Sequence, residues 1–368
     1  MNSSYIKKDF GKELGMDKKD EKPLTWSCPI EKVDRSKIVL AHGGGGTLMH
    51  QLIRNVFEAT FKNPLLQQHH DSAFLEIQGV KLAFTTDSFV VKPLFFPGGD
   101  IGKLAVCGTV NDLAMAGACP LYISVGFILE EGLEVEILQQ IVQTMKREAD
   151  YAGVSIVTGD TKVINNASGD GLYINTSGIG IVKQEPPPCP SQIRPGDCIL
   201  INGDIGRHGL AVLSAREEIH FEPELNSDCM NLIPAVLSLI DAGIPVHCLR
   251  DCTRGGLVSA LNELAEESCL SFYIREEDIP IHDNVRGACE ILGLNPLYVA
   301  NEGRFIAFVP KEYTTDVLQI WKDLYPELTP KEIGIVTENK GIPVLLKNTI
   351  GIDLALPMLS GEQLPRIC

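Results

Sequence analysis

Residues 84–120 read FTTDSFVVKPLFFPGGDIGKLAVCGTVNDLAMAGACP, and the fold prediction starts from this stretch. The apolar run at 80–86 is typical of a strand, and Asp87 closes it. From 102 to 117 the apolar residues leave little polar surface except at Asn111 and Asp112, which predicts a buried helix. A strand that leads into a buried helix indicates a mixed α/β protein in which the helix packs on a sheet.

The pattern continues on both sides of that stretch. It predicts a helix at 134–152 and strands at 154–157 and 172–182. PPPCP at 186–190 interrupts it, because proline continues neither a helix nor a central strand. Strands and helices then alternate again, and the predicted segments are strands at 198–202, 271–275 and 304–309 and helices at 231–242, 255–267 and 314–324.

We therefore predict two α/β domains, at residues 37–187 and 188–350. Residues 1–36 are predicted to be a disordered or appended N-terminal extension, since this charged segment buries too little to fold alone. Residues 351–368 are predicted to form a C-terminal tail.

A glycine run precedes the first long helix. The predicted strand at 38–40 leads into Gly43, Gly44, Gly45 and Gly46, and the helix that follows repeats apolar residues about every fourth position up to Phe61. That spacing predicts one buried helix face. Glycines at a helix start let backbone N–H groups approach a phosphate. The run lacks the Gly-Lys-Ser/Thr of a Walker A loop, so a flexible turn is the alternative.

Composition excludes several classes of function. The 368 residues carry a formal net charge of −16, which argues against a nucleic-acid or anionic-membrane partner. The N-terminus has no apolar signal-peptide core, and no apolar run is long enough to span a bilayer. The 11 cysteines include no CxxC pair. These features predict a cytoplasmic protein with reduced thiols.

Carboxylates recur where strands end or inside apolar segments, at Asp71, Asp87, Asp112 and Asp160. A buried carboxylate without a partner is costly, and magnesium bound to phosphates would supply one. Taken singly, each is better explained as a helix cap, a turn or a solvated residue. Together, beside a glycine loop, they favour a magnesium–nucleotide site. Asp251, in DCTRGG at 251–256, adds a carboxylate at a helix start, where an ordinary cap is the alternative.

The chain ends in GEQLPRIC at 361–368, where Pro365 prevents a helix. Cys368 is either an incidental thiol at a frayed end or the attachment point of a carried group. The ten residues that follow Met358 span up to roughly 35 Å when extended, enough for a carrier arm.

From about residue 38 to its end, the sequence resembles the HypE family of hydrogenase maturation proteins. The matching segments are LAHGGGG at 40–46, the stretch 84–120, GFILEEGL at 126–133, IVTGDTKV at 156–163, DCTRGGL at 251–257, NEGRF at 301–305 and PRIC at 365–368. The last segment distinguishes this family from aminoimidazole ribonucleotide synthetase, thiamine monophosphate kinase and selenophosphate synthetase, which lack a terminal cysteine arm. The departures are the N-terminal extension and Cys252 within the DxTRGG pattern.

The resemblance implies an α/β (α+β) fold of the two-domain aminoimidazole ribonucleotide synthetase-like type, with N-terminal domains that pair in a homodimer. It implies ATP and Mg²⁺ as cofactors. It further implies a carbamoyltransferase, HypF, that loads a carbamoyl group onto Cys368, and a HypC–HypD scaffold complex that accepts the cyanide. The implied reaction dehydrates this S-carboxamide to a thiocyanate for the [NiFe] centre, because phosphorylation by ATP turns the amide oxygen into a leaving group.

The resemblance also implies roles for single residues. Cys368 carries the substrate, Glu302 takes the carboxamide proton, and Lys162 stabilises the developing negative charge or assists the deprotonation. The loop Gly43–Gly46 closes over the phosphates. The residues implied to hold magnesium–ATP are Asp71, Asp87, Asn111, Asp112, Asp160 and Asp251, of which Asp71, Asp87, Asp112 and Asp251 are the metal ligands.

Two other functions remain open from the sequence. An ATP-dependent kinase or synthetase that acts on a free small molecule shares the magnesium–ATP residues, but it leaves the PRIC tail without a purpose. A non-catalytic carrier would use the tail and would let the nucleotide only gate its exposure. Removal of Cys368 distinguishes the three functions, because only the first loses its chemistry with the thiol.

Overall fold

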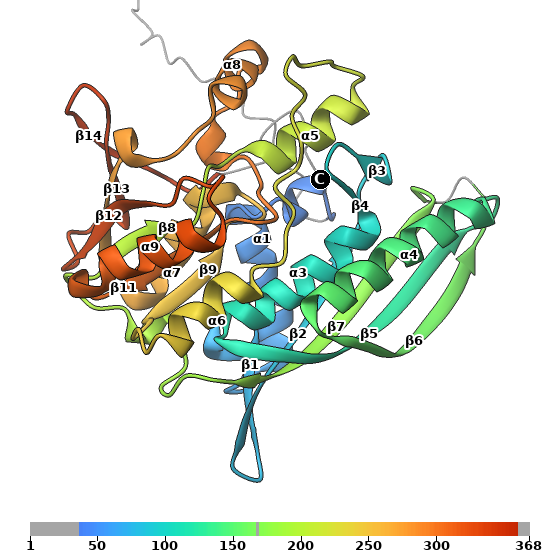
Figure 1. The fold of residues 1–368 in the computed structure, drawn as a ribbon, viewed down its shortest axis with the longest axis horizontal. Coiled ribbons are helices and arrows are strands. Elements are labelled where there is room, and N and C mark those ends of the chain that lie inside the picture. Colours follow the sequence, from blue (N-terminus) through green and yellow to red (C-terminus); the bar gives the residue numbers. More distant parts are fainter. Residues whose placement is uncertain (1–36, 167–168, 360–368) are drawn as a thin grey trace, which may run out of the picture. The chain divides into compact units, whose positions relative to one another are not determined.

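Two sheets organise the chain, with a central helix packed between them (Figure 1). The structure is a computed structural model that describes residues 37–166 and 169–359. The described residues from Val39 onwards form one compact unit, and all elements below belong to it.

The first sheet has five strands in the order β1-β2-β7-β5-β6. Its neighbours pair antiparallel except β5 and β6, which run parallel. The bounds are β1 (Ala73–Ile77), β2 (Val80–Phe89), β5 (Ala118–Glu130), β6 (Ser155–Ile164) and β7 (Leu172–Val182). Two helices, α3 (Ile101–Met115) and α4 (Val135–Ala152), lie over one face of this sheet (Figure 1).

The second sheet has seven strands in the order β14-β13-β10-β12-β8-β11-β9. Its strands are β8 (Cys198–Ile201), β9 (Cys248–Asp251), β10 (Ser271–Arg275), β11 (Phe305–Val309), β12 (Lys331–Thr337), β13 (Val344–Lys347) and β14 (Asp353–Ala355). The helices of this half are α5 (Arg207–Arg216), α6 (Ile233–Asp241), α7 (Gly256–Ser268), α8 (Asp283–Leu292) and α9 (Thr314–Leu324). A short hairpin joins β3 (Phe95–Phe96) to β4 (Gly99–Asp100).

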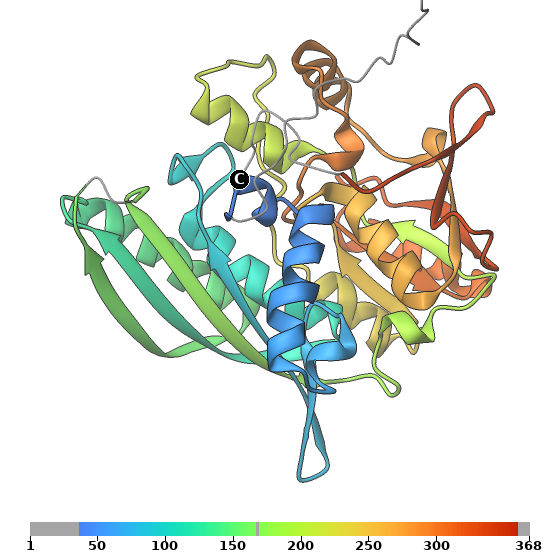
Figure 2. The same ribbon diagram turned by 180° about the vertical axis from the view of Figure 1, so that it is seen from behind.

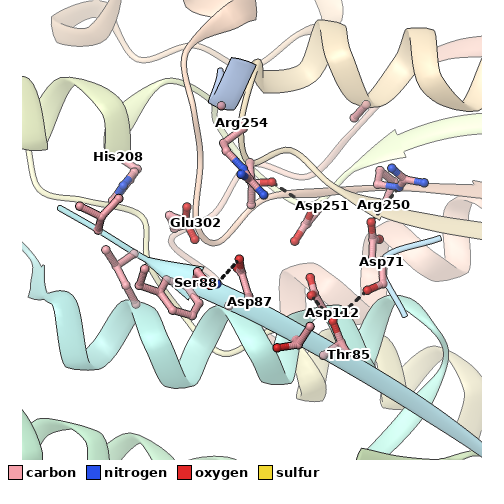
Figure 3. Close-up of a pocket in the computed structure, with 18 of the residues that line it drawn as sticks. Asp71, Thr85, Asp87, Ser88, Asp112, His208, Arg250, Asp251, Arg254 and Glu302 are labelled. Atoms are coloured by element: carbon pink, nitrogen blue, oxygen red, sulfur yellow. Dashed lines mark hydrogen bonds and ion pairs between the residues drawn. The ribbon is translucent and has the colours of Figure 1, made fainter. Parts of the chain in front are cut away.

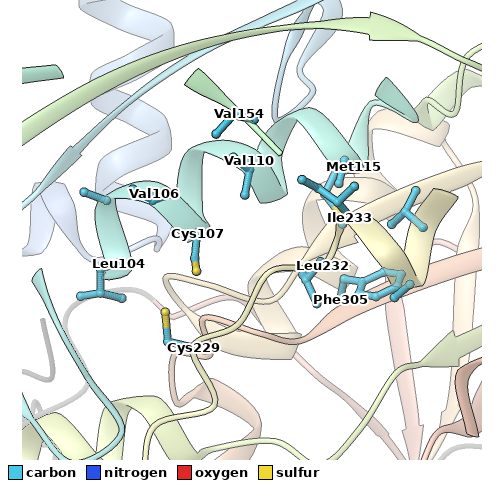
Figure 4. Close-up of a cluster of buried hydrophobic side chains, with 14 of the residues drawn as sticks. Leu104, Val106, Cys107, Val110, Met115, Val154, Cys229, Leu232, Ile233 and Phe305 are labelled. Carbon is cyan, nitrogen blue, oxygen red and sulfur yellow. The ribbon is translucent and has the colours of Figure 1, made fainter. Parts of the chain in front are cut away.

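The core is continuous across both sheets, because α3 is buried along most of its length. Its apolar side chains belong to one cluster with residues of α6, β11 and α9 (Figure 4). Gly102 lets α3 approach α4 closely, since a Cβ there would lie 2.6 Å from the carbonyl oxygen of Ile141. Among the described residues, no helix combines the length and apolar content needed to cross a bilayer.

Most predicted elements are confirmed, and several extend further than the sequence indicated. The strand predicted at 80–86 continues to Phe89, so Asp87 lies inside β2. The strand predicted at 154–157 continues to Ile164 and contains Asp160 and Lys162. The domain boundary near 187 stays a prediction.

Two predictions before residue 62 are wrong. The segment at 38–40 is no strand, and Leu40–Gly43 forms a 3-10 turn instead. The helical segment is present as α1 (Thr47–Leu52), a π-helical turn (Ile53–Glu58) and α2 (Ala59–Phe61), but it buries no residue. It lies on the surface (Figure 2), where Phe57 is 46% exposed and Phe61 is 64% exposed. Apolar spacing alone does not show whether a neighbouring element covers the face.

Candidate active site

A cavity of about 450 Å³ opens between β2, α3 and the start of α7 (Figure 3). Ionisable side chains dominate its wall. They are Asp71, Asp87, Asp112, Asp251, Glu263, Glu302, Arg250, Arg254 and His208. These residues come from both halves of the chain, so the cavity exists only because the two sheets share one core.

Thr85 connects three segments at the floor of the cavity. The Thr85 hydroxyl donates to Asp112 Oδ2 at 2.7 Å. The hydroxyl oxygen of Thr85 also lies 3.0 Å from the backbone oxygen of Asp71. Thr85 and Asp87 are two residues apart on β2 and therefore point to the same face of the strand. The buried helix α3 supplies Asp112 from below that face.

Arg250 joins the cavity residues of β9 and α7 to Asp71 and His69. Its guanidinium lies 3.0 Å from Asp71 Oδ1 and 2.6 Å from Glu263 Oε2. It also donates to the backbone oxygen of His69 at 3.0 Å. Since Asp251 follows Arg250 at the end of β9, these contacts also fix the strand that presents Asp251.

Enclosure by protein disfavours the charged form of every aspartate in this group. Burial raises the pKa of Asp71 to about 6. Burial and then the charge of Asp251 raise the pKa of Asp112 well above its usual value. Burial and then the charge of Asp71 do the same for Asp251, and burial also raises the pKa of Asp87. The two arginines of the cavity wall, Arg250 and Arg254, do not neutralise the combined negative charge of these carboxylates.

Glu302 lies in the same cavity (Figure 3). Burial, followed by the charges of Asp251 and Asp87, raises its pKa well above the usual glutamate value. A carboxyl group with a raised pKa beside a polar cavity is typical of a proton acceptor or donor in catalysis.

The glycine loop is locked against the start of α7. Gly45 has a φ of +74°, and a Cβ there would lie 2.6 Å from the backbone oxygen of Arg254. Ser259 of α7 donates a hydrogen bond of 2.8 Å to the Gly45 carbonyl. Gly43 contributes to the cavity wall. This position agrees with the predicted phosphate loop, and the role of Gly43–Gly46 stays a prediction.

The structure does not place Asn111 in the cavity wall. Its amide nitrogen donates to the carbonyl oxygens of Met230 at 3.0 Å and Glu302 at 3.4 Å. Its amide oxygen accepts from the Leu232 N–H at 2.8 Å. Asn111 therefore lies behind the cavity, where it contacts the backbone at Met230 and Leu232, just before α6, and at Glu302.

Asp160 and Lys162 lie apart from the other predicted residues. Both are on β6, an edge strand of the first sheet, and their side chains form an ion pair at 3.2 Å. Each side chain is 71% exposed. They line a second hollow, of about 430 Å³, with residues of β2, β5 and β7. Within one chain, the structure does not bring them to the carboxylate cavity.

Cys368 lies outside the described residues. The last described residue, Leu359, accepts hydrogen bonds from the N–H and the hydroxyl of Thr47, directly after the glycine loop. The sequence reasoning missed Thr85, Arg250 and Glu263. For Arg250 a signal was present, since a basic residue directly precedes Asp251.

Comparisons with known proteins identify the family. The family model for the N-terminal domain of AIR synthase related protein matches residues 69–182, and that for the C-terminal domain matches residues 194–347. The chain is 45% identical over 334 residues to the carbamoyl dehydratase HypE of Rhodobacter capsulatus, an alignment that covers 90% of this chain and 98% of that protein. The chain belongs to the HypE family.

Solved structures of HypE relatives agree with this identification. A HypE solved in a HypE–HypF complex matches with a TM-score of 0.79 and 42% identity over 84% of this chain and 99% of that chain. A HypE solved in complex with ATP matches with a TM-score of 0.75 and 44% identity over 90% of this chain and all of that chain, 100%. The predicted resemblance and the two-domain aminoimidazole ribonucleotide synthetase-like fold are thus confirmed.

Proposed function

We propose that this chain dehydrates a carbamoyl group carried on Cys368 to a thiocyanate, at the expense of ATP, and so supplies cyanide for [NiFe]-hydrogenase maturation. One observation carries the proposal: Glu302 shares a cavity with four aspartates whose charge two arginines do not balance. Relatives named carbamoyl dehydratase and a HypE solved with ATP support it.

The donor set fits a magnesium–ATP complex. Asp71 Oδ2 is buried and has no hydrogen-bond partner among the described residues, and the ionised forms of Asp112 and Asp251 repel each other. A divalent cation removes that repulsion. In the part of the chain that the structure describes, no three acidic, His or Cys side chains converge to hold a metal alone. Mg²⁺ shares its coordination shell between carboxylates, water and phosphate, so some of the four aspartates assigned below would hold it through water.

We assign the metal to Asp71, Asp87, Asp112 and Asp251, and the phosphates to the loop Gly43–Gly46. When bound, magnesium–ATP supplies the phosphoryl group that makes the carboxamide oxygen a leaving group. The carboxylates hold and orient the complex, and Arg250 keeps Asp71 in place through their 3.0 Å ion pair.

Glu302 is proposed to take the carboxamide proton. Burial, and then the charges of Asp251 and Asp87, raise its pKa and so favour its protonated form in the free chain. A cation that neutralises those two aspartates lowers the pKa of Glu302 and so prepares it as a base. Two protons leave the carboxamide nitrogen, one when the oxygen is phosphorylated and one, taken by Glu302, when phosphate leaves the carbon. The C≡N bond then forms, and the peptide has lost one oxygen and two hydrogens, the atoms of one water.

Lys162 and Asp160 join this site in our proposal through a homodimer. The face of the first sheet that α3 and α4 do not cover exposes Phe84 and Tyr122, which lie on one cross-strand row through Ile179. A second copy packed on this face would cover that apolar surface and place its own Lys162 near the carboxylate cavity. Mixing of singly inactive variants, described in the Discussion, tests this arrangement.

For partners, we propose a HypF carbamoyltransferase as the donor of the carbamoyl group and a HypC–HypD complex as the acceptor of the cyanide. The HypE relative solved in a HypE–HypF complex supports the first. A cytoplasmic location follows from this proposal, because the partners act on nascent metal centres.

The decisive experiment follows the mass of the C-terminal peptide after carbamoylation. With ATP and Mg²⁺, the wild-type peptide should lose the mass of one water with release of one phosphate. Cys368→Ala should abolish this loss and still bind ATP, whereas Cys269→Ala, which removes an exposed thiol elsewhere in the chain, should react normally. Product formation by the Cys368→Ala chain would instead indicate a kinase or synthetase that acts on a free small molecule.

A further inference from the structure

The segment between α5 and α6 packs tightly against α3 behind the cavity. Cys229 of this segment is 3% exposed and faces Cys107 of α3, which is 1% exposed (Figure 4). Leu232 and Ile233 of the same segment join the shared core. The segment therefore has a fixed position relative to α3, the helix that carries Asp112.

Asp228, directly before Cys229, holds the backbone at Glu302. Its carboxylate is fully buried and accepts the N–H of Glu302 at 3.2 Å and the N–H of Gly303 at 3.3 Å, one on each oxygen. Position 303 must be glycine, because a Cβ there would lie 1.9 Å from the Asp228 carbonyl oxygen. The Nε of Arg304, at 3.9 Å, offsets the charge of the carboxylate.

Asn111 holds the same residue from the other side. Its amide nitrogen lies 3.4 Å from the Glu302 carbonyl oxygen and 3.0 Å from that of Met230. The backbone N–H of Met230 also lies 3.5 Å from the Glu302 carbonyl oxygen. Both peptide groups that flank the Glu302 side chain are thus bound by elements whose own positions are fixed by the core.

We propose that Asp228 and Asn111 are positioning residues for Glu302. They hold its backbone in the position from which its carboxyl group faces the substrate. This inference rests on the proposed function, since it names what keeps the proposed base in place. Neither residue touches the reacting atoms. Hydrogen bonds to an ionised acceptor are stronger than neutral ones, so Asp228 is the main contributor. A displacement of about 1 Å at a reacting group is enough to lower a rate about a hundredfold.

The test separates a loss of Glu302 positioning from a loss of ATP binding. Asp228→Asn retains the shape but replaces one acceptor oxygen by an NH₂ group that faces a backbone N–H. In a single turnover of carbamoylated protein, we expect the rate of water loss to fall about a hundredfold. ATP affinity, measured by calorimetry, should stay within about twofold, because no ATP-binding residue proposed above contacts Asp228. Asn111→Ser should show the same split, because the Asn111 amide binds backbone groups behind the cavity wall and not the ATP-binding position that the resemblance implied; a loss of ATP affinity in this variant would overturn the inference for Asn111. This variant carries the test if Asp228→Asn does not fold.

Asp197→Asn is the matched control. Asp197 is also a buried carboxylate that accepts a backbone N–H, from Arg194 at 2.8 Å, but it lies away from the cavity. It should lose stability comparably and keep the wild-type rate. An unchanged rate in Asp228→Asn, or equal losses of rate and ATP affinity, would overturn the inference. Failure of wild-type protein to lose water would instead overturn the proposed function, so the two failures are distinct.

Discussion

Replacement of Asp71 by asparagine should make the nucleotide-free chain more stable. The Asp71 side chain is 9% exposed, and one of its oxygens has no hydrogen-bond partner in the part of the chain that the structure describes. Its ion pair with Arg250 compensates only part of the cost of burial, as the raised pKa indicates. Asparagine has the same shape and no charge, so it removes the cost and retains the packing.

The magnitude follows from the shift in pKa. Burial raises the pKa of Asp71 from 3.8 to about 6. At about 1.4 kcal/mol per unit, the ionised group lowers the free energy of unfolding by about 3 kcal/mol. Because the folded-state pKa is the higher one, the folded chain binds more protons between pH 3.8 and about 6. The cost is therefore fully present above about pH 6 and absent below pH 3.8.

Urea unfolding at pH 7 and pH 4, without nucleotide, measures the effect. Asp71→Asn should gain up to about 3 kcal/mol at pH 7 and almost nothing at pH 4. Saturating magnesium–ATP should reverse the order, since a ligand at a thousandfold excess over its Kd adds about 4 kcal/mol to the chain that binds it. Asp150→Asn, an exposed aspartate of α4 paired with Lys146, is the control and should change little. If Asp71→Asn is less stable at pH 7 without nucleotide, the Arg250 ion pair outweighs burial and the reasoning is refuted.

Two further predictions concern the dimer and the glycine loop. Lys162→Ala chains and Glu302→Gln chains should each be inactive alone. After mixing and subunit exchange they should recover about a quarter of wild-type activity, because half of the dimers then contain one intact shared site out of two. No recovery would contradict a shared site. Gly45→Ala should lower ATP affinity about tenfold, because its Cβ would meet the Arg254 carbonyl at 2.6 Å. Gly153→Ala, with a φ of +70° but open space around it, is the control, and equal ATP affinity in both variants would contradict this prediction.

The elements that the sequence predicted well are those with local causes. The helix at 134–152 shows its amphipathic repeat directly, and α4 has nearly the predicted bounds. The mostly apolar segment 102–117 predicted a buried helix, and α3 is one. Burial of the segment 47–61 was mispredicted because its apolar repeat is real, but the described elements, α7 among them, cover it only in part.

The site was predictable as a set of residues but not as a geometry. Asp71, Asp87, Asp112, Asp251 and Glu302 line one cavity, as the motif resemblance implied. Asp160 and Lys162 do not, because strand order decides which residues meet and the sequence does not contain that order. Arg250 was missed for a similar reason, since its partners Asp71 and Glu263 come from distant segments.

The excess of carboxylates over arginines in the cavity destabilises the free chain, and the proposed function explains why it is retained. Without a cation, burial disfavours the ionised forms of Asp112, Asp251 and Glu302, and nearby charges add to this: Asp251 raises the pKa of both Asp112 and Glu302, and Asp71 raises the pKa of Asp251. For the same reason we expect the cavity to bind a divalent cation, so that the energy lost in the free chain is recovered on binding. Under the proposed function, Glu302 becomes a better base when the metal neutralises its neighbours. An aspartate whose removal both stabilises the free chain and abolishes ATP binding therefore belongs to the metal set, whereas one whose removal only destabilises, as we expect for Asp197, is structural.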